Sequence, residues 1–380
     1  MRALMGNYAD MLAEFSSNLK QPMSFLADEW TDVARWQAET RAAVTELLSY
    51  EPAPVPMDVR VDRQYVSDGL LYEHISYAQP YGPRTEGILM RPENAVGKLP
   101  GFLALHDHGG FKYFGKEKLV ALADEHPILG DFKREYYGGR SWATELAKRG
   151  YCVFVPDVFL WGSRKQLLET LPEWMTGKAG KHPEGSREAI EEYNNLTGNY
   201  ETIIAKSLFL AGSTWPGIMA YDDRRALDYL LSRPEVDAQR VGCGGLSGGG
   251  TRTIFLSALD DRIRACCCVG FMCGFAETVA HRIQCHTWMF HLPGLAKLMD
   301  LHDLLSLHGP KPTMVLYDSD DPLWTLEGQQ HSDAQLQRIY AKMDASAMYR
   351  GRFYPGGHKF DVPMQEDAFA FMDAHLKQEV

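Results

Sequence analysis

A serine in a glycine-rich turn is the clearest chemical signal in the sequence. Ser247 lies in the pentapeptide Gly245-Leu246-Ser247-Gly248-Gly249, which has the pattern G-x-S-x-G. Residues 239–244 before it form a run of β type, and residues 250–258 after it can form a helix. Strand, tight turn and helix are the context of a nucleophile elbow, where small neighbours let the serine adopt a strained backbone conformation. The pattern predicts a catalytic serine, and the alternative is a turn that merely contains one.

A catalytic serine needs a base within hydrogen-bond reach, because its hydroxyl is a weak nucleophile at neutral pH. In α/β-hydrolases an acid and then a histidine follow the serine along the chain. His358 comes after the last expected strand, and Gly356 and Gly357 give it a flexible loop. We therefore expect His358 to be the base. The other histidines after Ser247 fit this order or position less well: His281, His286, His291, His302, His308, His331 and His375.

The acid is expected in the loop that follows a strand at residues 313–317. Three carboxylates lie there, Asp318, Asp320 and Asp321. The acid would hold the imidazole in the right tautomer and stabilise the imidazolium. We favour Asp321, which is restricted by the following proline. Asp320 is the second candidate, and either residue could instead serve as a turn or cap residue.

Two backbone amides are expected to stabilise the negative charge that develops on the substrate oxygen. One belongs to Gly248, directly after the serine. The other should come from the turn His106-Asp107-His108-Gly109-Gly110, which follows the first expected buried strand. His106 and His108 could alternatively contribute to a metal site, but no H-E-x-x-H or C-x-x-C motif completes one. We expect neither a metal nor a cofactor.

The elements that must position these groups change along the chain. Residues 1–56 form an N-terminal segment, with helical periodicity over residues 9–50, and residues 57–380 form the main domain. Residues 57–92 show β periodicity and suggest antiparallel strands. From residue 100 onward, continuous apolar strands alternate with helices, which predicts a mostly parallel sheet covered on both faces. In such a sheet, ligands bind at the carboxyl ends of the strands, where Ser247 falls.

The alternation of strands and helices gives specific expectations. Strands are expected at 59–66, 70–72, 87–90, 101–105, 151–155, 239–244, 263–269, 313–317 and 348–354. Helices are expected at 141–148, 220–232, 250–258 and 364–376. Three long insertions, near 109–138, 162–215 and 271–311, should lie over the site. We hypothesise that aromatic residues in or beside them form a rim over the serine: Phe111, Tyr113, Phe114, Trp161, Trp174, Trp215 and Trp288.

Composition excludes several classes of protein. The chain has 380 residues, of which 45% are hydrophobic and 23% charged, and its net charge is −11. The acidic balance argues against nucleic acid or an anionic membrane as a partner. Seven cysteines, three of them consecutive at 266–268 in an apolar run, suggest buried thiols in a reducing compartment. With no signal peptide or apolar span recognised, we expect a cytoplasmic protein and a possible homo-oligomer.

The ordered set of motifs resembles the acetyl xylan esterase and dienelactone hydrolase branch of the α/β-hydrolases over residues 57–378. The matching residues are His106 to Gly110, Pro156-Asp157, Gly162, Arg164, Asp222, Arg225 to Leu230, Pro234 to Asp237, Gly245 to Gly249, Asp321 to Leu323 and Gly356 to His358. The resemblance implies Ser247 as nucleophile, Asp321 as acid and His358 as base. It also implies oxyanion amides from Gly248 and His108, with Gly109 or Gly110 less favoured. Dienelactone hydrolases proper use cysteine where this chain has Ser247.

We therefore expect a serine hydrolase that cleaves a small-molecule carboxylic ester with a short acyl group such as acetate, through an acyl-enzyme. The same triad could instead cleave a lactone, a carbon–carbon bond or a peptide. A third hypothesis is a non-catalytic α/β-hydrolase that binds a ligand or partner. Since candidates exist for all three members of the triad, this last hypothesis is the least favoured.

Overall fold

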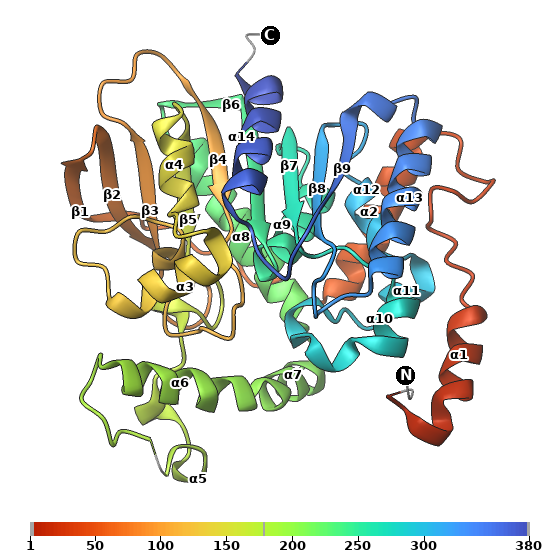
Figure 1. The fold of residues 1–380 in the computed structure, drawn as a ribbon, viewed down its shortest axis with the longest axis horizontal. Coiled ribbons are helices and arrows are strands. Elements are labelled where there is room, and N and C mark those ends of the chain that lie inside the picture. Colours follow the sequence, from red (N-terminus) through yellow and green to blue (C-terminus); the bar gives the residue numbers. More distant parts are fainter. Residues whose placement is uncertain (1–3, 178, 378–380) are drawn as a thin grey trace.

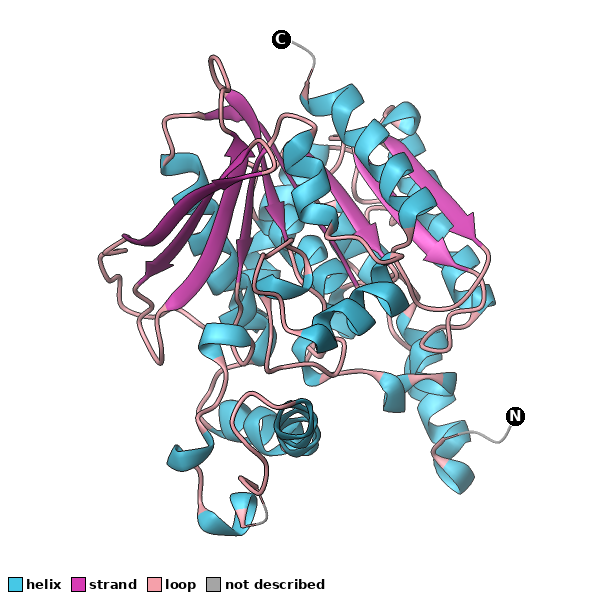
Figure 2. Ribbon diagram, turned by 60° about the vertical axis from the view of Figure 1, so that its left-hand side comes forward, coloured by secondary structure: helices cyan, strands magenta, loops and turns pink. Residues whose placement is uncertain are grey.

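The strands form one sheet, and Ser247 directly follows its strand β6. A computed structural model describes residues 4–177 and 179–377 (Figure 1). These residues form a nine-stranded sheet in the order β1-β2-β3-β5-β4-β6-β7-β8-β9. Figure 2 shows its strong twist and the helices on both sides. The strands are β1 (Arg60–Ser67), β2 (Leu70–Tyr77), β3 (Thr85–Pro92), β4 (Leu99–Ala104), β5 (Cys152–Pro156), β6 (Val236–Leu246), β7 (Ala265–Val269), β8 (Thr313–Asp318) and β9 (Tyr349–Tyr354).

The sheet has an antiparallel edge and a parallel body, as predicted. Strands β1, β2 and β3 pair antiparallel with one another, and β3 pairs antiparallel with β5. All pairs from β5–β4 to β8–β9 are parallel. Every residue of β5, β7 and β8 is buried, which explains their continuous apolar runs. Cys266 to Cys268 lie in β7 as buried thiols, as expected, whereas Cys285 is exposed.

Helices cover the two faces of the sheet with separate apolar cores (Figure 1). One face packs against α3 (Pro127–Tyr137), α4 (Trp142–Lys148) and α14 (Val362–Leu376). The other face packs against α2 (Val33–Leu48), α8 (Trp215–Ser232), α9 (Gly248–Leu259), α12 (Leu301–Ser306) and α13 (Leu326–Lys342). Helix α8 begins five residues before its expected start, because Thr214 caps it and Pro216 is tolerated in its first turn. The sequence analysis did not predict α13.

The N-terminal segment contains two separate helices, α1 (Ala9–Ser17) and α2. The expectation of continuous helical structure over residues 9–50 was wrong for residues 18–32, which form turns. Phe25 and Trp30 in this stretch are buried in the same core as α2 and the sheet. Asp32 then caps α2 by accepting a hydrogen bond from the amide of Arg35. Since the core is shared, a domain boundary at residue 56 stays a prediction.

The three insertions carry structure of their own. The first contains α3. The second contains α5 (Glu173–Thr176), α6 (Arg187–Asn199) and α7 (Glu201–Leu210), which lie below the sheet in Figure 1. The third contains α10 (Phe275–His281), on the same side as α7, together with α11 (Leu295–Leu298) and α12.

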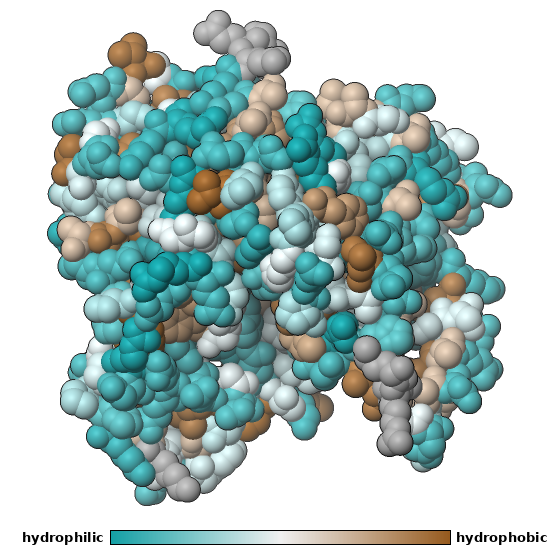
Figure 3. Space-filling view, viewed as in Figure 1, coloured by the Kyte–Doolittle hydropathy of each residue, from teal (hydrophilic) through white to brown (hydrophobic). Residues whose placement is uncertain are grey.

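The surface in Figure 3 is mostly hydrophilic, with small, scattered hydrophobic patches. Within the described ranges, no single helix has the length and apolar character to cross a membrane. Helices α7 and α8 meet those criteria only as a pair, with a bend of 92° between them.

Candidate active site

Ser247 occupies a strained turn between β6 and α9. Its backbone angles are φ 56° and ψ −117°, a conformation that residues other than glycine rarely adopt. Its amide donates a hydrogen bond to Val269 O at 2.8 Å, and its carbonyl accepts one from the Thr251 amide at 2.9 Å. The turn is thus fixed to the neighbouring strand β7 and to the first turn of α9.

Glycines beside the serine are required by close packing. A Cβ atom on Gly245 or on Gly249 would lie 2.1 Å from the carbonyl oxygen of Leu105. Leu105 directly follows β4, so the elbow packs on the backbone of the neighbouring strand's end. No side chain fits in this space, which gives the G-x-S-x-G pattern its physical reason here.

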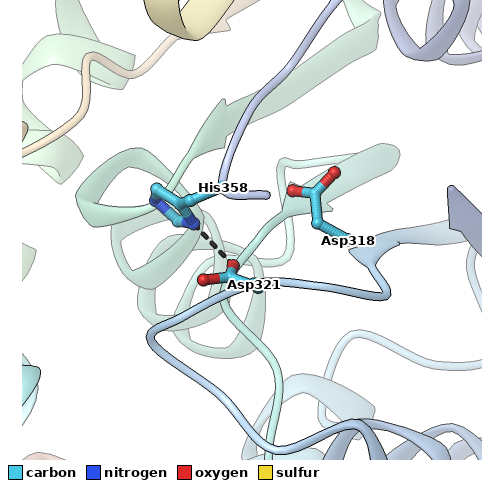
Figure 4. A group of neighbouring side chains, drawn as sticks. All are labelled: Asp318, Asp321 and His358. Atoms are coloured by element: carbon cyan, nitrogen blue, oxygen red, sulfur yellow. Dashed lines mark hydrogen bonds and ion pairs between the residues drawn. The ribbon is translucent and has the colours of Figure 1, made fainter. Parts of the chain in front are cut away.

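His358 and Asp321 lie side by side on the loops after β9 and β8 (Figure 4). Nδ1 of His358 is 2.6 Å from Oδ2 of Asp321, whose side chain is fully buried. The other Asp321 oxygen accepts a hydrogen bond from the Leu323 amide at 2.8 Å. Asp320 has a different role, because its Oδ2 accepts a hydrogen bond from the Gly356 amide at 2.9 Å. Of the two carboxylates that the sequence left open, Asp321 is therefore the one that contacts the imidazole.

The environment of His358 favours a protonated Nδ1 and a free Nε2. Burial acts to lower the pKa of His358, but the hydrogen bond and charge of Asp321, together with the charge of Asp318, outweigh it and raise this pKa. Nε2 has no hydrogen-bond partner among the residues that the structure describes. The ring packs against Gly270, where a Cβ atom would lie 3.1 Å from His358 Cε1. A nitrogen free to accept a proton is what a general base requires.

Asp318 adds a second carboxyl group to this cluster. Ligand atoms of Asp318, Asp321 and His358 all lie within 4.8 Å of one another (Figure 4). Burial is the main cause that raises the pKa of Asp318 to about 7. Two ligands of one tetrahedral zinc ion would lie about 3.3 Å apart, given zinc–ligand bonds of about 2 Å. The separation of 2.6 Å between His358 and Asp321 therefore suits a shared proton better than a shared metal ion.

The backbone of His108 faces the elbow. A Cβ atom on Gly248 would lie 2.6 Å from the His108 nitrogen, so the two residues are in direct backbone contact. The His108 carbonyl accepts hydrogen bonds from the Phe111 amide at 3.1 Å and from Lys118 Nζ and Trp161 Nε1 at 3.2 Å each. Within the described chain, the amide of His108 makes no hydrogen bond. The two amides expected to form the oxyanion site thus lie next to each other.

The side chains of His106, Asp107 and His108 make separate contacts, and His106 Nε2 has no hydrogen-bond partner among the described residues. Burial lowers the pKa of His106 well below its usual value, and its Nδ1 lies 3.0 Å from the Asp107 carbonyl. Asp107 is buried and accepts hydrogen bonds from Lys118 Nζ, at 3.2 Å, and from the hydroxyl of Tyr137. The ring of His108 contacts Glu201. These separate contacts do not bring His106, Asp107 and His108 together as metal ligands.

Ser247, His358 and the two glycines after His108 open on one cavity of about 390 Å³. Residues from all three insertions line its walls. Its lining residues are His108, Gly109, Gly110, Tyr136, Gly198, Glu201, Ser247, Gly248, Phe271, Cys285, His286, Thr287, Leu323 and His358.

The hypothesis of an aromatic rim over the serine named the wrong residues, because none of the seven aromatic residues lines this cavity. Trp161 and Trp215, the first residue of α8, are buried in the core with ring centroids 6.2 Å apart, and Trp174 is 72% exposed.

One family model and one known sequence show what this chain is similar to. The family model "Acetyl xylan esterase (AXE1)" matches residues 218–287, which include the elbow. The "Putative hydrolase YtaP" of Bacillus subtilis (strain 168) is 26% identical over 347 residues, covering 90% of this chain and 100% of that protein.

Solved structures with a similar fold cover most of this chain. A "putative acetyl xylan esterase" from Bacteroides fragilis NCTC 9343 superposes with a TM-score of 0.69 at 16% identity, covering 92% of this chain and 83% of that one. The chain has the α/β-hydrolase fold. A glucuronoyl esterase from Solibacter usitatus gives a TM-score of 0.62 at 16% identity, covering 91% of this chain and 94% of that one. The matched family model and the shared fold both make this chain similar to esterases.

Several motif residues of this α/β-hydrolase support the site without lining it. Asp157 accepts hydrogen bonds from Lys116 Nζ and from the Ser163 amide, both at 2.8 Å. A Cβ atom on Gly162 would lie 2.4 Å from the Asp157 carboxyl group, which explains this glycine. Asp222 accepts a hydrogen bond from the Phe159 amide at 3.0 Å and pairs with Arg164 at 3.5 Å. These contacts hold the loop after β5.

Seven residues that line the cavity were not predicted to do so from the sequence: Tyr136, Gly198, Glu201, Phe271, Cys285, His286 and Thr287. Each lies in an insertion, where no motif marked it. His286 stacks on Trp324 with ring centroids 4.0 Å apart, and burial lowers its pKa to about 4. His286 is therefore neutral near neutral pH.

Proposed function

We propose that this α/β-hydrolase cleaves carboxylic esters with a short acyl group by means of Ser247, His358 and Asp321. One observation carries the proposal. The strained serine and the Asp321-bound imidazole of His358 open on the same cavity, beside two adjacent backbone amides. This is the set of groups that acyl transfer requires: a nucleophile, a base with its orienting acid, and donors for an oxyanion.

In the first half-reaction, His358 Nε2 takes the proton as Ser247 Oγ attacks the ester carbonyl carbon. The amides of Gly248 and His108 donate hydrogen bonds to the oxyanion of the tetrahedral intermediate. His358 then returns the proton to the departing alcohol oxygen, which leaves an acyl group on Ser247. In the second half-reaction, a water molecule gives its proton to His358 and attacks this acyl group. His358 then returns the proton to Ser247 Oγ as the acid is released.

Acetate as the acyl group is supported by two observations. The matched family model describes acetyl xylan esterases. The cavity of about 390 Å³ is near the lower end of the range of about 300–1,000 Å³ for small-molecule sites, and it must hold part of the alcohol as well, which favours a small acyl group. We propose an acetylated carbohydrate as the substrate class, in line with the esterase-like relatives.

A panel of substrates tests this proposal. We expect p-nitrophenyl acetate to be hydrolysed faster than the butyrate and octanoate esters, and acetylated xylo-oligosaccharides to release acetate. Turnover restricted to lactones, or to the methyl ester of glucuronic acid, would contradict the assignment of the acyl group.

A further inference from the structure

Glu201, the first residue of α7, lies on the wall of the catalytic cavity and joins three distant segments. Its Oε1 lies 2.6 Å from His108 Nε2 and 2.6 Å from Lys112 Nζ. Its Oε2 accepts a hydrogen bond from the Thr287 hydroxyl at 2.9 Å. One carboxylate therefore connects the turn after β4 with the second and third insertions.

The charges in this cluster are balanced and buried. Glu201 is 8% exposed and Lys112 is 2% exposed. Burial acts to raise the pKa of Glu201, but the hydrogen bond from His108 and the charges around it outweigh this effect and lower the pKa to about 2. Glu201 is therefore a carboxylate throughout the range in which an esterase is assayed.

The contacts of His108 also define its tautomer. Nδ1 accepts a hydrogen bond from the Gly110 amide at 2.9 Å, so the ring proton lies on Nε2 and is donated to Glu201. Both ring nitrogens and the carbonyl oxygen of His108 are thus held by partners. The one polar group of His108 left without a partner among the described residues is the backbone amide beside Gly248.

We propose that Glu201 is a positioning residue for the oxyanion site. Its carboxylate fixes the imidazole of His108, and this fixes the direction in which the His108 amide points. The inference rests on the proposed function, because it assigns that amide to the oxyanion of the same reaction. The second insertion, through Glu201, and the third, through Thr287, therefore support the oxyanion site in addition to lining the cavity.

Such a role should affect the transition state more than the bound substrate. Negative charge develops on the substrate oxygen only as the tetrahedral intermediate forms, and not in the bound ester. A displaced amide therefore lowers kcat and leaves KM nearly unchanged. The affinity for a mimic of the tetrahedral intermediate should fall in parallel. Phenylboronic acid is a suitable probe, because its boron forms a tetrahedral adduct with a serine oxygen.

The test is Glu201→Gln assayed with p-nitrophenyl acetate and with phenylboronic acid. We expect kcat to fall about 10-fold or more, because small displacements of catalytic groups lower the rate by such factors. The affinity for phenylboronic acid should fall by a similar factor. The acid limb of the pH profile should stay in place, since Glu201 does not contact His358. Glu188→Gln, which removes an exposed carboxylate from α6 in the same insertion, is the matched control and should behave as wild type.

His108→Ala provides an independent arm, because it removes the imidazole and keeps the backbone amide. We expect it to lose as much kcat as Glu201→Gln, and the double variant to lose no more than either single variant. If Glu201→Gln does not fold, the kcat of His108→Ala tests the inference. Wild-type kcat in either single variant, or additive losses in the double variant, would overturn the inference. Failure of the proposed function itself would appear separately, as full activity of Ser247→Ala.

Discussion

The Cα atom of Gly248 lies against the backbone nitrogen of His108, so closely that a Cβ atom would come within 2.6 Å of that nitrogen. This contact joins the elbow after β6 to the turn after β4. It explains why the residue after the serine is glycine. It also places the two amides of the proposed oxyanion site next to each other.

Gly248→Ala should therefore disturb catalysis directly. The added methyl group must push the His108 amide away, and loss of one oxyanion donor costs about 10²–10³ in kcat. Steady-state kinetics with p-nitrophenyl acetate would measure this loss. Gly130→Ala, in α3, is the control, because its Cβ would meet only the end of the Arg134 side chain, at an ordinary 3.5 Å. Equal activity of the two variants would show that Gly248 has no part in the oxyanion site.

Asp318→Asn should shift the pH dependence of the reaction. Asp318, whose own pKa of about 7 leaves it partly ionised near neutral pH, helps in its charged form to raise the pKa of His358, so its replacement by asparagine lowers that pKa. The base works only when His358 is neutral, and the acid limb of kcat/KM should therefore move to lower pH. The pH profiles of the two proteins with p-nitrophenyl acetate measure this shift. An unchanged limb, or one moved to higher pH, would be evidence that Asp318 does not act on His358.

Cys285 places an exposed thiol on the wall of the catalytic cavity, whereas the other six cysteines are buried. Iodoacetamide should alkylate Cys285 first, because the thiolate must be accessible to react. The adduct should then slow ester hydrolysis by obstructing the cavity. Mass spectrometry would locate the modification, and Cys285→Ser should keep its activity under the same treatment. Full activity of alkylated wild-type protein would place Cys285 outside the substrate's path.

The buried ion pair between Arg252 and Asp223 should be important for stability. Nη2 of Arg252 lies 2.6 Å from Oδ1 of Asp223, and Nη1 donates a hydrogen bond to the His106 carbonyl at 3.3 Å. Arg252→Met would leave a buried carboxylate unpaired, which lowers the free energy of unfolding by about 3–5 kcal/mol.

Urea unfolding measures this effect. Arg35→Met, which removes a partner from an exposed ion pair with Glu39 in α2, is the matched control and should unfold like wild type. If Arg252→Met unfolded at the same urea concentration as the control, the pair would have no net stabilising role.

The parts of the site that the sequence predicted are those marked by local patterns. The elbow around Ser247 has its own motif, and the loops of Asp321 and His358 follow buried strands, so their order along the chain indicated where they meet. Glu201 could not be predicted, because its partners His108 and Thr287 lie 93 and 86 residues away and no motif links them. The choice between Asp320 and Asp321 likewise depended on which carboxylate the loop turns toward the imidazole.

The errors in the predicted fold have a similar origin. Apolar residues between 18 and 32 continue the helical periodicity, but Phe25 and Trp30 are buried through turns that pack on the main core. Trp161 and Trp215 lie at the boundaries of an insertion, and the sequence could not show that they face the core and not the cavity. Periodicity identifies apolar residues, but tertiary packing decides what they contact.

The role of Ser247 is the central claim, and the most direct test is hydrolysis of p-nitrophenyl acetate by wild type and by Ser247→Ala. Circular dichroism should first show that the variant is folded. We expect wild-type turnover, a loss of about 10⁴-fold or more in the variant, and labelling of wild type alone by a fluorophosphonate. A folded Ser247→Ala protein with wild-type turnover would contradict the proposed mechanism.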